Sequence, residues 1–227
     1  MTLEAVVFDL DGTLLDTLDD INEVVNRVFK DHGLSSRTRE EVRFAVGRGV
    51  EHLVLELTEG EVIEPGILPL LSDNIRRVYL EMGSVMTRPY PGIPEVLEEL
   101  AGIGVPMAVL TNKPQASAFE SVARFFPCIG FVTVRGASGR HPLKPSPEAS
   151  KPVLEALGCP PEMVVLIGDS DVDMDTAVNA GMVPVGVSWG FRSTRLLLEH
   201  GAERIIRSPS EIPGLLLMDH GEERRGD

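Results

Sequence analysis

The sequence alternates short, continuous apolar runs with segments of helical periodicity, and this alternation restricts the fold more than any other feature. The apolar runs lie at Ala5–Phe8, Val105–Leu110, Ile129–Val134, Met163–Ile167 and Val183–Val187. Such runs are typical of strands that are buried on both faces. The helical patterns between them lie at Pro94–Leu100, Ala116–Phe125, Pro147–Leu157 and Val172–Ala180. The alternation predicts an α/β fold, a doubly wound parallel sheet with helices on both of its faces.

One interval breaks this alternation. About ninety residues separate the first expected strand from the second, far more than a crossover between parallel strands needs. Helical patterns fill the interval, beginning with an apolar stripe at Ile21, Val24, Val25, Val28 and Phe29. Thr17 and Asp20, at the start of that stripe, match a capping box. We therefore expect a helical cap domain at residues 15–86, inserted into an α/β core formed by 1–14 and 87–218, with a flexible polar tail at 219–227.

Polar residues follow the expected strands at the places where ligands bind in open α/β sheets, beyond the carboxyl ends of the strands. The first strand runs into Asp9-Leu-Asp11-Gly-Thr13, and the second into Thr111-Asn112-Lys113. The fourth runs into Gly168-Asp169, with Asp173 a few residues later, and Lys144 lies in the loop before the preceding helix. Each of these motifs is weak alone, but all of them are expected at one rim of the sheet.

These residue types suit one kind of chemistry. Crowded carboxylates need a cation, and an oxygen-rich site favours a hard ion such as Mg²⁺. A carboxylate can attack phosphorus to form an aspartyl-phosphate. A second carboxyl two residues later lies on the same side of an extended strand, where it can protonate the leaving group and later activate water. A lysine and a hydroxyl can hold the remaining phosphoryl oxygens.

With these motifs in order along the chain, the sequence resembles the haloacid dehalogenase-like hydrolases, and the inserted helices match the position of that family's small cap. The resemblance implies a nucleophile and Mg²⁺ ligand at Asp9, and a general acid/base at Asp11 that also lends its carbonyl to the metal. It implies phosphate contacts from Thr111, Asn112 and Lys144. It further implies a Mg²⁺ ligand at Asp169 and a partner for Lys144 at Asp173.

Within the superfamily, the sequence is most similar to the phosphoglycolate phosphatase group. The likeness extends to Thr111-Asn-Lys-Pro114, Ala177-Val-Asn-Ala-Gly-Met182 and Val187-Ser-Trp-Gly-Phe-Arg192. Ile21 stands where β-phosphoglucomutase-like enzymes carry histidine, which argues against a phosphomutase. The preferred function is therefore a phosphatase for 2-phosphoglycolate. The alternatives are pyrophosphate, a nucleoside monophosphate or a sugar phosphate as substrate, a mutase, or a phosphate-binding regulatory protein without turnover.

The amino-acid composition restricts the kinds of partner that the protein is expected to bind. A net charge of −14 and an aromatic share of 5% argue against nucleic acid, so a small phosphorylated metabolite is the expected partner. No apolar run reaches membrane-spanning length, and no signal peptide is evident. The two cysteines, Cys128 and Cys159, are too few for a disulfide framework. We therefore expect a cytoplasmic protein. Arg48, between two glycines of the cap, is either a ligand for a substrate carboxylate or a solvated side chain. His141 is expected at the surface.

Overall fold

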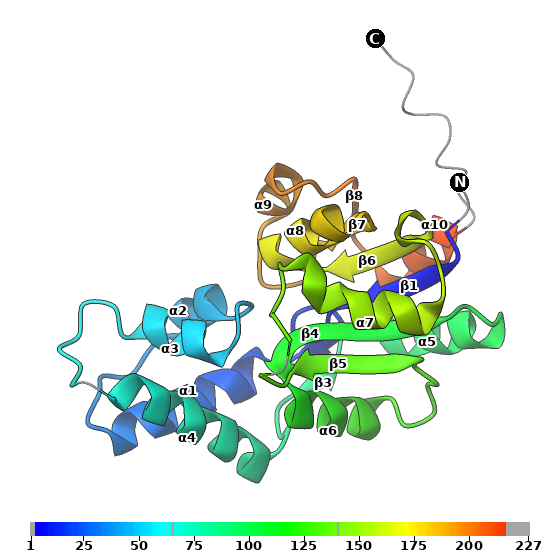
Figure 1. The fold of residues 1–227 in the computed structure, drawn as a ribbon. Coiled ribbons are helices and arrows are strands. Elements are labelled where there is room, and N and C mark those ends of the chain that lie inside the picture. The colour runs from blue at the N-terminus through cyan, green and yellow to red at the C-terminus, as the bar shows by residue number, and fades with distance from the viewer. Residues whose placement is uncertain (1–2, 65, 140, 217–227) are drawn as a thin grey trace.

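The larger lobe of the protein is built on a parallel sheet with the strand order β5-β4-β1-β6-β7-β8 (Figure 1). The computed structural model describes residues 3–64, 66–139 and 141–216. The strands are β1 (Ala5–Phe8), β4 (Met107–Pro114), β5 (Thr133–Ala137), β6 (Val164–Gly168), β7 (Val183–Val187) and β8 (Arg204–Ile206). All neighbouring pairs are parallel. The predicted α/β fold with a parallel sheet is confirmed.

Helices cover both faces of this sheet, because successive side chains of a strand point to opposite faces. Val6 and Phe8 of β1 belong to the apolar cluster that includes Leu97 of α5, whereas Ala5 and Val7 belong to the one that includes Val153 of α7. The helices of this lobe are α5 (Ile93–Gly102), α6 (Gln115–Phe125), α7 (Pro147–Leu157), α8 (Asp171–Ala180), α9 (Thr194–Glu199) and α10 (Ile212–Leu216). Short 3-10 helices lie at Pro161–Met163 and Pro209–Glu211.

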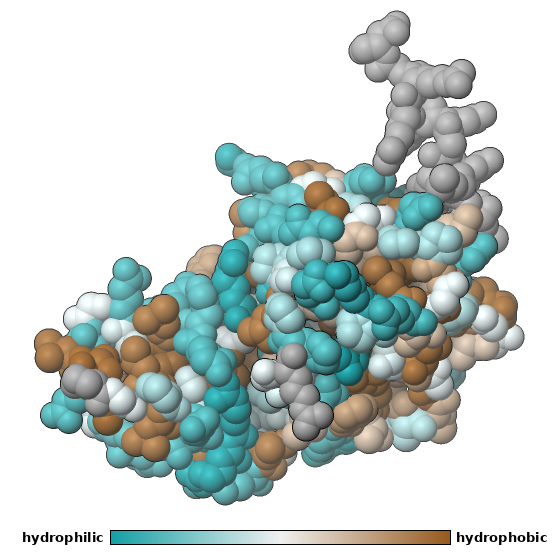
Figure 2. All heavy atoms as spheres, viewed as in Figure 1, coloured by the Kyte–Doolittle hydropathy of each residue, from teal (hydrophilic) through white to brown (hydrophobic). Residues whose placement is uncertain are grey.

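The helical lobe between β1 and β4 lies beside the sheet (Figure 1). It packs around a separate apolar cluster, to which the larger lobe contributes Phe191. Its helices are α1 (Leu18–Asp31), α2 (Arg39–Ala45), α3 (Val50–Leu57) and α4 (Ile67–Met82). The chain enters and leaves this lobe side by side, because β2 (Leu15–Asp16) and β3 (Arg88–Pro89) pair antiparallel. Hydrophobic side chains gather at the outer end of the lobe, where Val62 is fully exposed (Figure 2).

The start of α1 differs from its prediction. The capping box of Thr17 and Asp20 is wrong: the Thr17 side chain makes no cap hydrogen bond, and its buried hydroxyl has no partner. The Asp20 carboxylate is instead buried against the segment that leaves the lobe, where it accepts hydrogen bonds from the Met86 amide (3.0 Å) and from the Thr87 amide and hydroxyl (2.7 and 2.6 Å). Asp20 therefore ties the two connections between the lobes together.

The other differences between the predicted and the observed elements are smaller. β5 begins at Thr133 rather than Ile129, because Ile129 lies in a turn whose amide bonds to the Phe126 carbonyl. The short elements β8, α9 and α10 follow the last predicted strand and have too few residues to give a clear periodicity. The tail at 219–227 lies outside the described residues. Within the described part of the chain, no helix has the length and apolarity that crossing a membrane requires.

Candidate active site

Three neighbouring strands deliver the predicted polar residues to one edge of the sheet. Asp9 and Asp11 follow β1, Thr111 lies in the last part of β4, and Asp169 follows β6. Because β4, β1 and β6 are adjacent and parallel, their carboxyl ends meet at the same rim. Asp9, Thr111 and Asp169 are all buried, and together with Asp11 they line one cavity beneath the helical lobe.

Lys144 connects two of the buried carboxylates. Its Nζ donates to Asp9 Oδ1 at 2.8 Å and to Asp173 Oδ1 at 2.6 Å. Burial alone would lower the pKa of Lys144, but Asp173 and Asp9 together hold it above its usual value, so the ammonium stays charged. Burial raises the pKa of Asp9 to about 7; Lys144 opposes this shift, and Asp173 adds to it. Asp9 is thus held by a cation and crowded by other carboxylates.

Asp173 is fixed by its own helix. Ser170 caps α8, and the Asp173 Oδ2 atom accepts hydrogen bonds from the Ser170 amide (3.1 Å) and hydroxyl (2.6 Å). The capping box leaves the other carboxylate oxygen of Asp173 facing Lys144. Asp173 therefore acts on the site by positioning Lys144.

Asp169 lies between two backbone segments that only glycine permits. A Cβ at Gly12 would lie 2.3 Å from Asp169 Oδ2, and one at Gly190 would lie 2.1 Å from Asp169 Cβ. The carboxylate accepts hydrogen bonds from the Phe191 amide (2.7 Å) and the Thr13 hydroxyl (3.2 Å). Burial, followed by repulsion from Asp173 and Asp9, raises the pKa of Asp169 well above its usual value.

Carboxylate oxygens of Asp9, Asp169 and Asp173 lie within 4.8 Å of one another. Asp9 and Asp169 line the cavity, whereas Asp173 does not and faces Lys144 and its own helix start, so Asp9 and Asp169 are the two side chains best placed to hold a cation. An oxygen-only donor set suits a hard divalent ion, and neutralisation by such an ion would relieve the burial cost that raises both pKa values. The residues present therefore fit a bound metal ion.

Asp11 has a lysine of its own. Lys113 Nζ donates to Asp11 Oδ1 and to the hydroxyl of Tyr79 on α4, both at 2.8 Å. The ammonium also lies 4.3 Å from the centre of the Tyr79 ring. Burial tends to lower the pKa of Lys113, but Asp11 and Tyr79 outweigh it and raise that pKa. The two aspartates of the first motif are thus each paired with a different buried lysine.

The structure places Thr111 and Asn112 differently. The Thr111 hydroxyl accepts a hydrogen bond from the Lys113 amide (3.2 Å), so its own proton remains available for a ligand in the cavity. The Asn112 side chain is engaged with the backbone: it accepts from the Lys144 amide (2.9 Å) and donates to the carbonyls of Lys144 (3.0 Å) and Gly47 (2.9 Å). Asn112 therefore holds the Lys144 loop and a loop of the helical lobe in place.

The helical lobe closes the cavity with apolar side chains. The cavity has a volume of about 90 Å³. Its lining from this lobe includes Ile21, Val46, Val50, Leu53, Ile75 and Tyr79. This cover limits the contact of the buried carboxylates with water, which strengthens the charge interactions inside.

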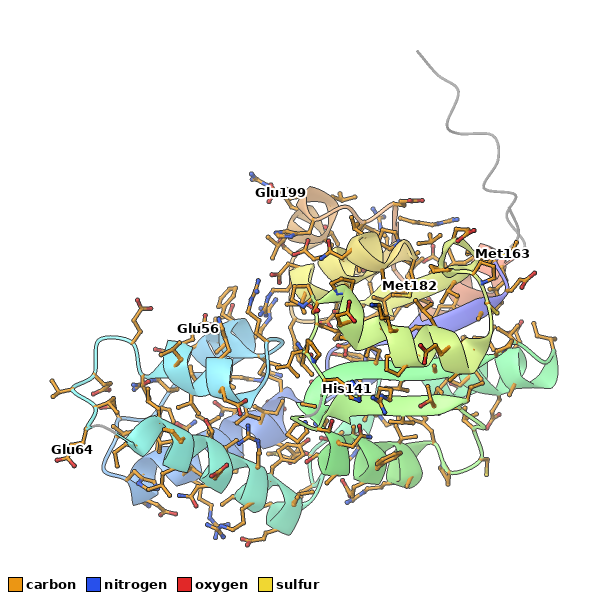
Figure 3. All side chains as sticks on the ribbon, in the orientation of Figure 1. Glu56, Glu64, His141, Met163, Met182 and Glu199 are labelled. Carbon is orange, nitrogen blue, oxygen red and sulfur yellow. The ribbon has the colours of Figure 1, made fainter. Side chains whose placement is uncertain are left out.

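Arginines fasten the helical lobe to the core. Arg192 donates to the carbonyls of Arg43 (2.6 Å), Phe44 (2.7 Å) and Val46 (2.6 Å), where α2 ends. Arg48 is paired with Asp171 at the start of α8 and is not among the residues that line the cavity. The loop that carries Arg48 thus docks on the core. His141 is exposed in the loop between β5 and α7 (Figure 3).

Sequence reasoning did not assign roles to Lys113, Tyr79 or Arg192. One signal was present for Lys113: it lies two residues after Thr111, and alternate residues of a strand share a face, just as Asp9 and Asp11 do. Arg192 lies in the stretch Val187-Ser-Trp-Gly-Phe-Arg192 that carries the family likeness, but that likeness does not specify its contacts. Tyr79 has no comparable signal. The contacts of both residues cross between the two lobes.

The fold and the site together define an α/β enzyme with a buried carboxylate and lysine centre under a helical cap. The chain belongs to the haloacid dehalogenase-like hydrolase family, whose model matches residues 6–187. Within that family it is a phosphatase: it is 35% identical to the phosphoglycolate phosphatase of Rhodobacter capsulatus over 217 residues, which cover 93% of this chain and 96% of the relative.

Two further relatives extend the comparison. N-acetylmuramic acid 6-phosphate phosphatase of Pseudomonas aeruginosa is 32% identical over 225 residues, covering 95% of this chain and 96% of the relative. A crystal structure from Lactobacillus delbrueckii subsp. bulgaricus, assigned as a phosphoglycolate phosphatase, superimposes with a TM-score of 0.87 at 29% identity, covering 96% of this chain and 100% of that one. The predicted family is confirmed.

Proposed function

We propose that the protein hydrolyses the phosphomonoester 2-phosphoglycolate with the help of Mg²⁺, through a phosphoaspartate on Asp9. The observation that carries the proposal is the Lys144 ammonium, which bridges Asp9 and Asp173 while Asp169 lies alongside. Such an arrangement provides a carboxylate nucleophile, a charge that attracts the phosphoryl group, and a place for a cation. In this proposal residues 15–86 act as the cap.

The metal ion would be held by the carboxylates of Asp9 and Asp169 and by the backbone carbonyl of Asp11. Bound there, Mg²⁺ would neutralise charge on the phosphoryl oxygens and lower the repulsion between them and the nucleophile. Lys144 and the hydroxyl of Thr111 would bind the remaining phosphoryl oxygens. The Asn112 side chain, which is hydrogen-bonded to the Lys144 backbone, would act by holding Lys144 in place rather than by contacting phosphate directly.

The first chemical step forms a bond between a carboxylate oxygen of Asp9 and phosphorus. The bond between phosphorus and the ester oxygen breaks, and its electron pair remains on the leaving oxygen, to which Asp11 gives a proton. The second step reverses these roles: Asp11 takes a proton from water, the water oxygen bonds to phosphorus, and the bond from phosphorus to Asp9 breaks. Inorganic phosphate leaves, and both aspartates return to their starting states.

The proposed substrate is supported by the relatives and by the cavity. Phosphoglycolate phosphatases recur among the similar proteins at 29–35% identity. Ile21 lines the cavity and offers no proton donor or acceptor, which favours hydrolysis over a mutase reaction.

The test measures phosphate release with Mg²⁺ from 2-phosphoglycolate, N-acetylmuramic acid 6-phosphate, a nucleoside monophosphate and pyrophosphate. Asp9→Asn should lower turnover by roughly a thousandfold or more, because it removes the nucleophile. Asp19→Asn, at an exposed ion pair with Arg39, is the control and should retain activity. Mass spectrometry of the acid-quenched reaction should find one added phosphoryl group on the peptide that contains Asp9.

The outcomes separate mechanism from substrate. Preference for another ester, with Asp9→Asn inactive, would leave the mechanism standing and refute 2-phosphoglycolate. If no ester is hydrolysed with any divalent ion, the proposed enzyme activity is wrong, and binding of phosphate without turnover becomes the alternative.

A further inference from the structure

The cavity lining includes polar groups to which the proposed phosphoryl chemistry assigns no role. Among the described residues that line the cavity, the cationic side chains are Arg76, Lys113 and Arg192. Arg76 is paired with Glu51 and Asp73, and Arg192 donates to carbonyls of the helical lobe. Lys113 differs from these two because both of its partners, Asp11 and Tyr79, also line the cavity.

Lys113 has donor capacity to spare. Its side chain is 4% exposed, and its ammonium donates to Asp11 and to the hydroxyl of Tyr79. An ammonium has three donors, so one remains for a ligand. A buried cation with an open donor favours an anion as that ligand.

A second observation lies on the helix that begins two residues later. Ser117 lines the cavity, is buried, and its hydroxyl has no hydrogen-bond partner. Buried hydroxyls are usually paired, so a ligand is the natural partner for this one. Ser117 lies in the first turn of α6, where Pro114 provides no side-chain cap and the backbone N–H groups lack helical acceptors. The start of an α-helix carries partial positive charge and attracts anions.

We propose that Lys113, Ser117 and the first turn of α6 form a second anion subsite, which binds the carboxylate of the leaving group. This inference rests on the proposed phosphatase function and extends the proposed substrate from 2-phosphoglycolate to a class, the phosphate esters of short α-hydroxy acids. The Tyr79 hydroxyl comes from the helical lobe, so the surroundings of Lys113 are complete only when that lobe covers the core.

The position of the subsite restricts where the carboxylate lies in the substrate. Asp11 must reach the ester oxygen to protonate it, and Lys113 lies 2.8 Å from Asp11. An anion bound by Lys113 is therefore close to the ester oxygen. A carboxylate one carbon away from that oxygen, as in 2-phosphoglycolate, satisfies this restriction, whereas a carboxylate on the far side of a sugar ring does not.

The test compares two esters of similar size, 2-phosphoglycolate and 2-hydroxyethyl phosphate, which has an uncharged leaving group. The measured quantity is the ratio of kcat/KM for the two. Lys113→Met should lower this ratio by roughly thirtyfold or more, and Ser117→Ala by roughly three- to tenfold, since each removes a buried contact to the charged ester. The ratio cancels any effect that Lys113 has on Asp11, because both esters need the same acid.

Ser121→Ala is the matched control. Ser121 is also buried on α6 with an unpaired hydroxyl, but it does not line the cavity, so its removal should leave the ratio unchanged. Thermal unfolding of each variant establishes that it is folded, and Ser117→Ala alone decides the question if Lys113→Met does not fold.

Equal losses for both esters in Lys113→Met and an unchanged ratio in Ser117→Ala would overturn the subsite and leave the phosphatase proposal standing. If the unaltered protein hydrolyses neither of these esters but does hydrolyse another phosphate ester, the subsite and 2-phosphoglycolate are overturned and the phosphoaspartate mechanism stands. If it hydrolyses no ester at all, both proposals are overturned.

Discussion

The packing of Gly190 against Asp169 predicts that one added methyl group will disable the proposed metal site. In Gly190→Ala the new Cβ would lie 2.1 Å from Asp169 Cβ and 2.6 Å from both Asp169 Oδ2 and the Gly12 carbonyl oxygen. Asp169 or the Gly190 backbone must move about 1.3 Å to restore an ordinary contact of 3.4 Å.

A displacement of this size exceeds what a magnesium site tolerates. Ligand distances to Mg²⁺ hold within about 0.2 Å, and a misplacement of about 1 Å in an active site costs on the order of a hundredfold. We expect the Mg²⁺ concentration for half-maximal activity to rise by roughly ten- to a hundredfold. The free energy of unfolding should fall by about 1–3 kcal/mol, as in other overpacked cores.

The assay is phosphate release from 2-phosphoglycolate as a function of Mg²⁺ concentration, with urea unfolding measured in parallel. Gly102→Ala is the control: a Cβ there would meet nothing within 4 Å, so kinetics should be unchanged. If Gly190→Ala kept its half-saturating Mg²⁺ concentration within about twofold of the unaltered protein, the assignment of Asp169 as a metal ligand would be refuted.

Two further predictions concern protons and the connection between the lobes. Because burial raises the pKa of Asp9 to about 7, the metal-free protein should lose stability as the pH rises from near 4 through 7. Mg²⁺ should therefore raise the melting temperature more at pH 8 than at pH 6. Equal shifts of the melting temperature at the two pH values would contradict this prediction. Asp20→Ala leaves the Thr87 amide and hydroxyl without their buried acceptor, so the free energy of unfolding measured in urea should fall by about 2–4 kcal/mol. The control Asp19→Ala, at an exposed residue, should lower it by less than about 0.5 kcal/mol. Similar losses in the two variants would refute the role of Asp20.

Much of the core follows from local pattern. The β1, β6 and β7 strands lie where continuous apolar runs predict them, within a residue at either end. Asp9, Asp11 and Asp169 were identifiable because each follows such a run, and parallel strands bring their carboxyl ends to one edge. β8 and the start of β5 were not predictable in the same way, because three residues or a polar start leave no clear period.

The sequence by itself predicted which residues carry the candidate chemistry, since polar residues that follow parallel strands are expected at one edge of the sheet. Only the tertiary structure decided what surrounds them. Arg48 meets Asp171 rather than the cavity, Asn112 holds the Lys144 backbone, and Tyr79 reaches Lys113 from the helical lobe. Each of these contacts joins segments far apart in the chain, and their distances depend on how two separately packed lobes meet, which no local periodicity encodes.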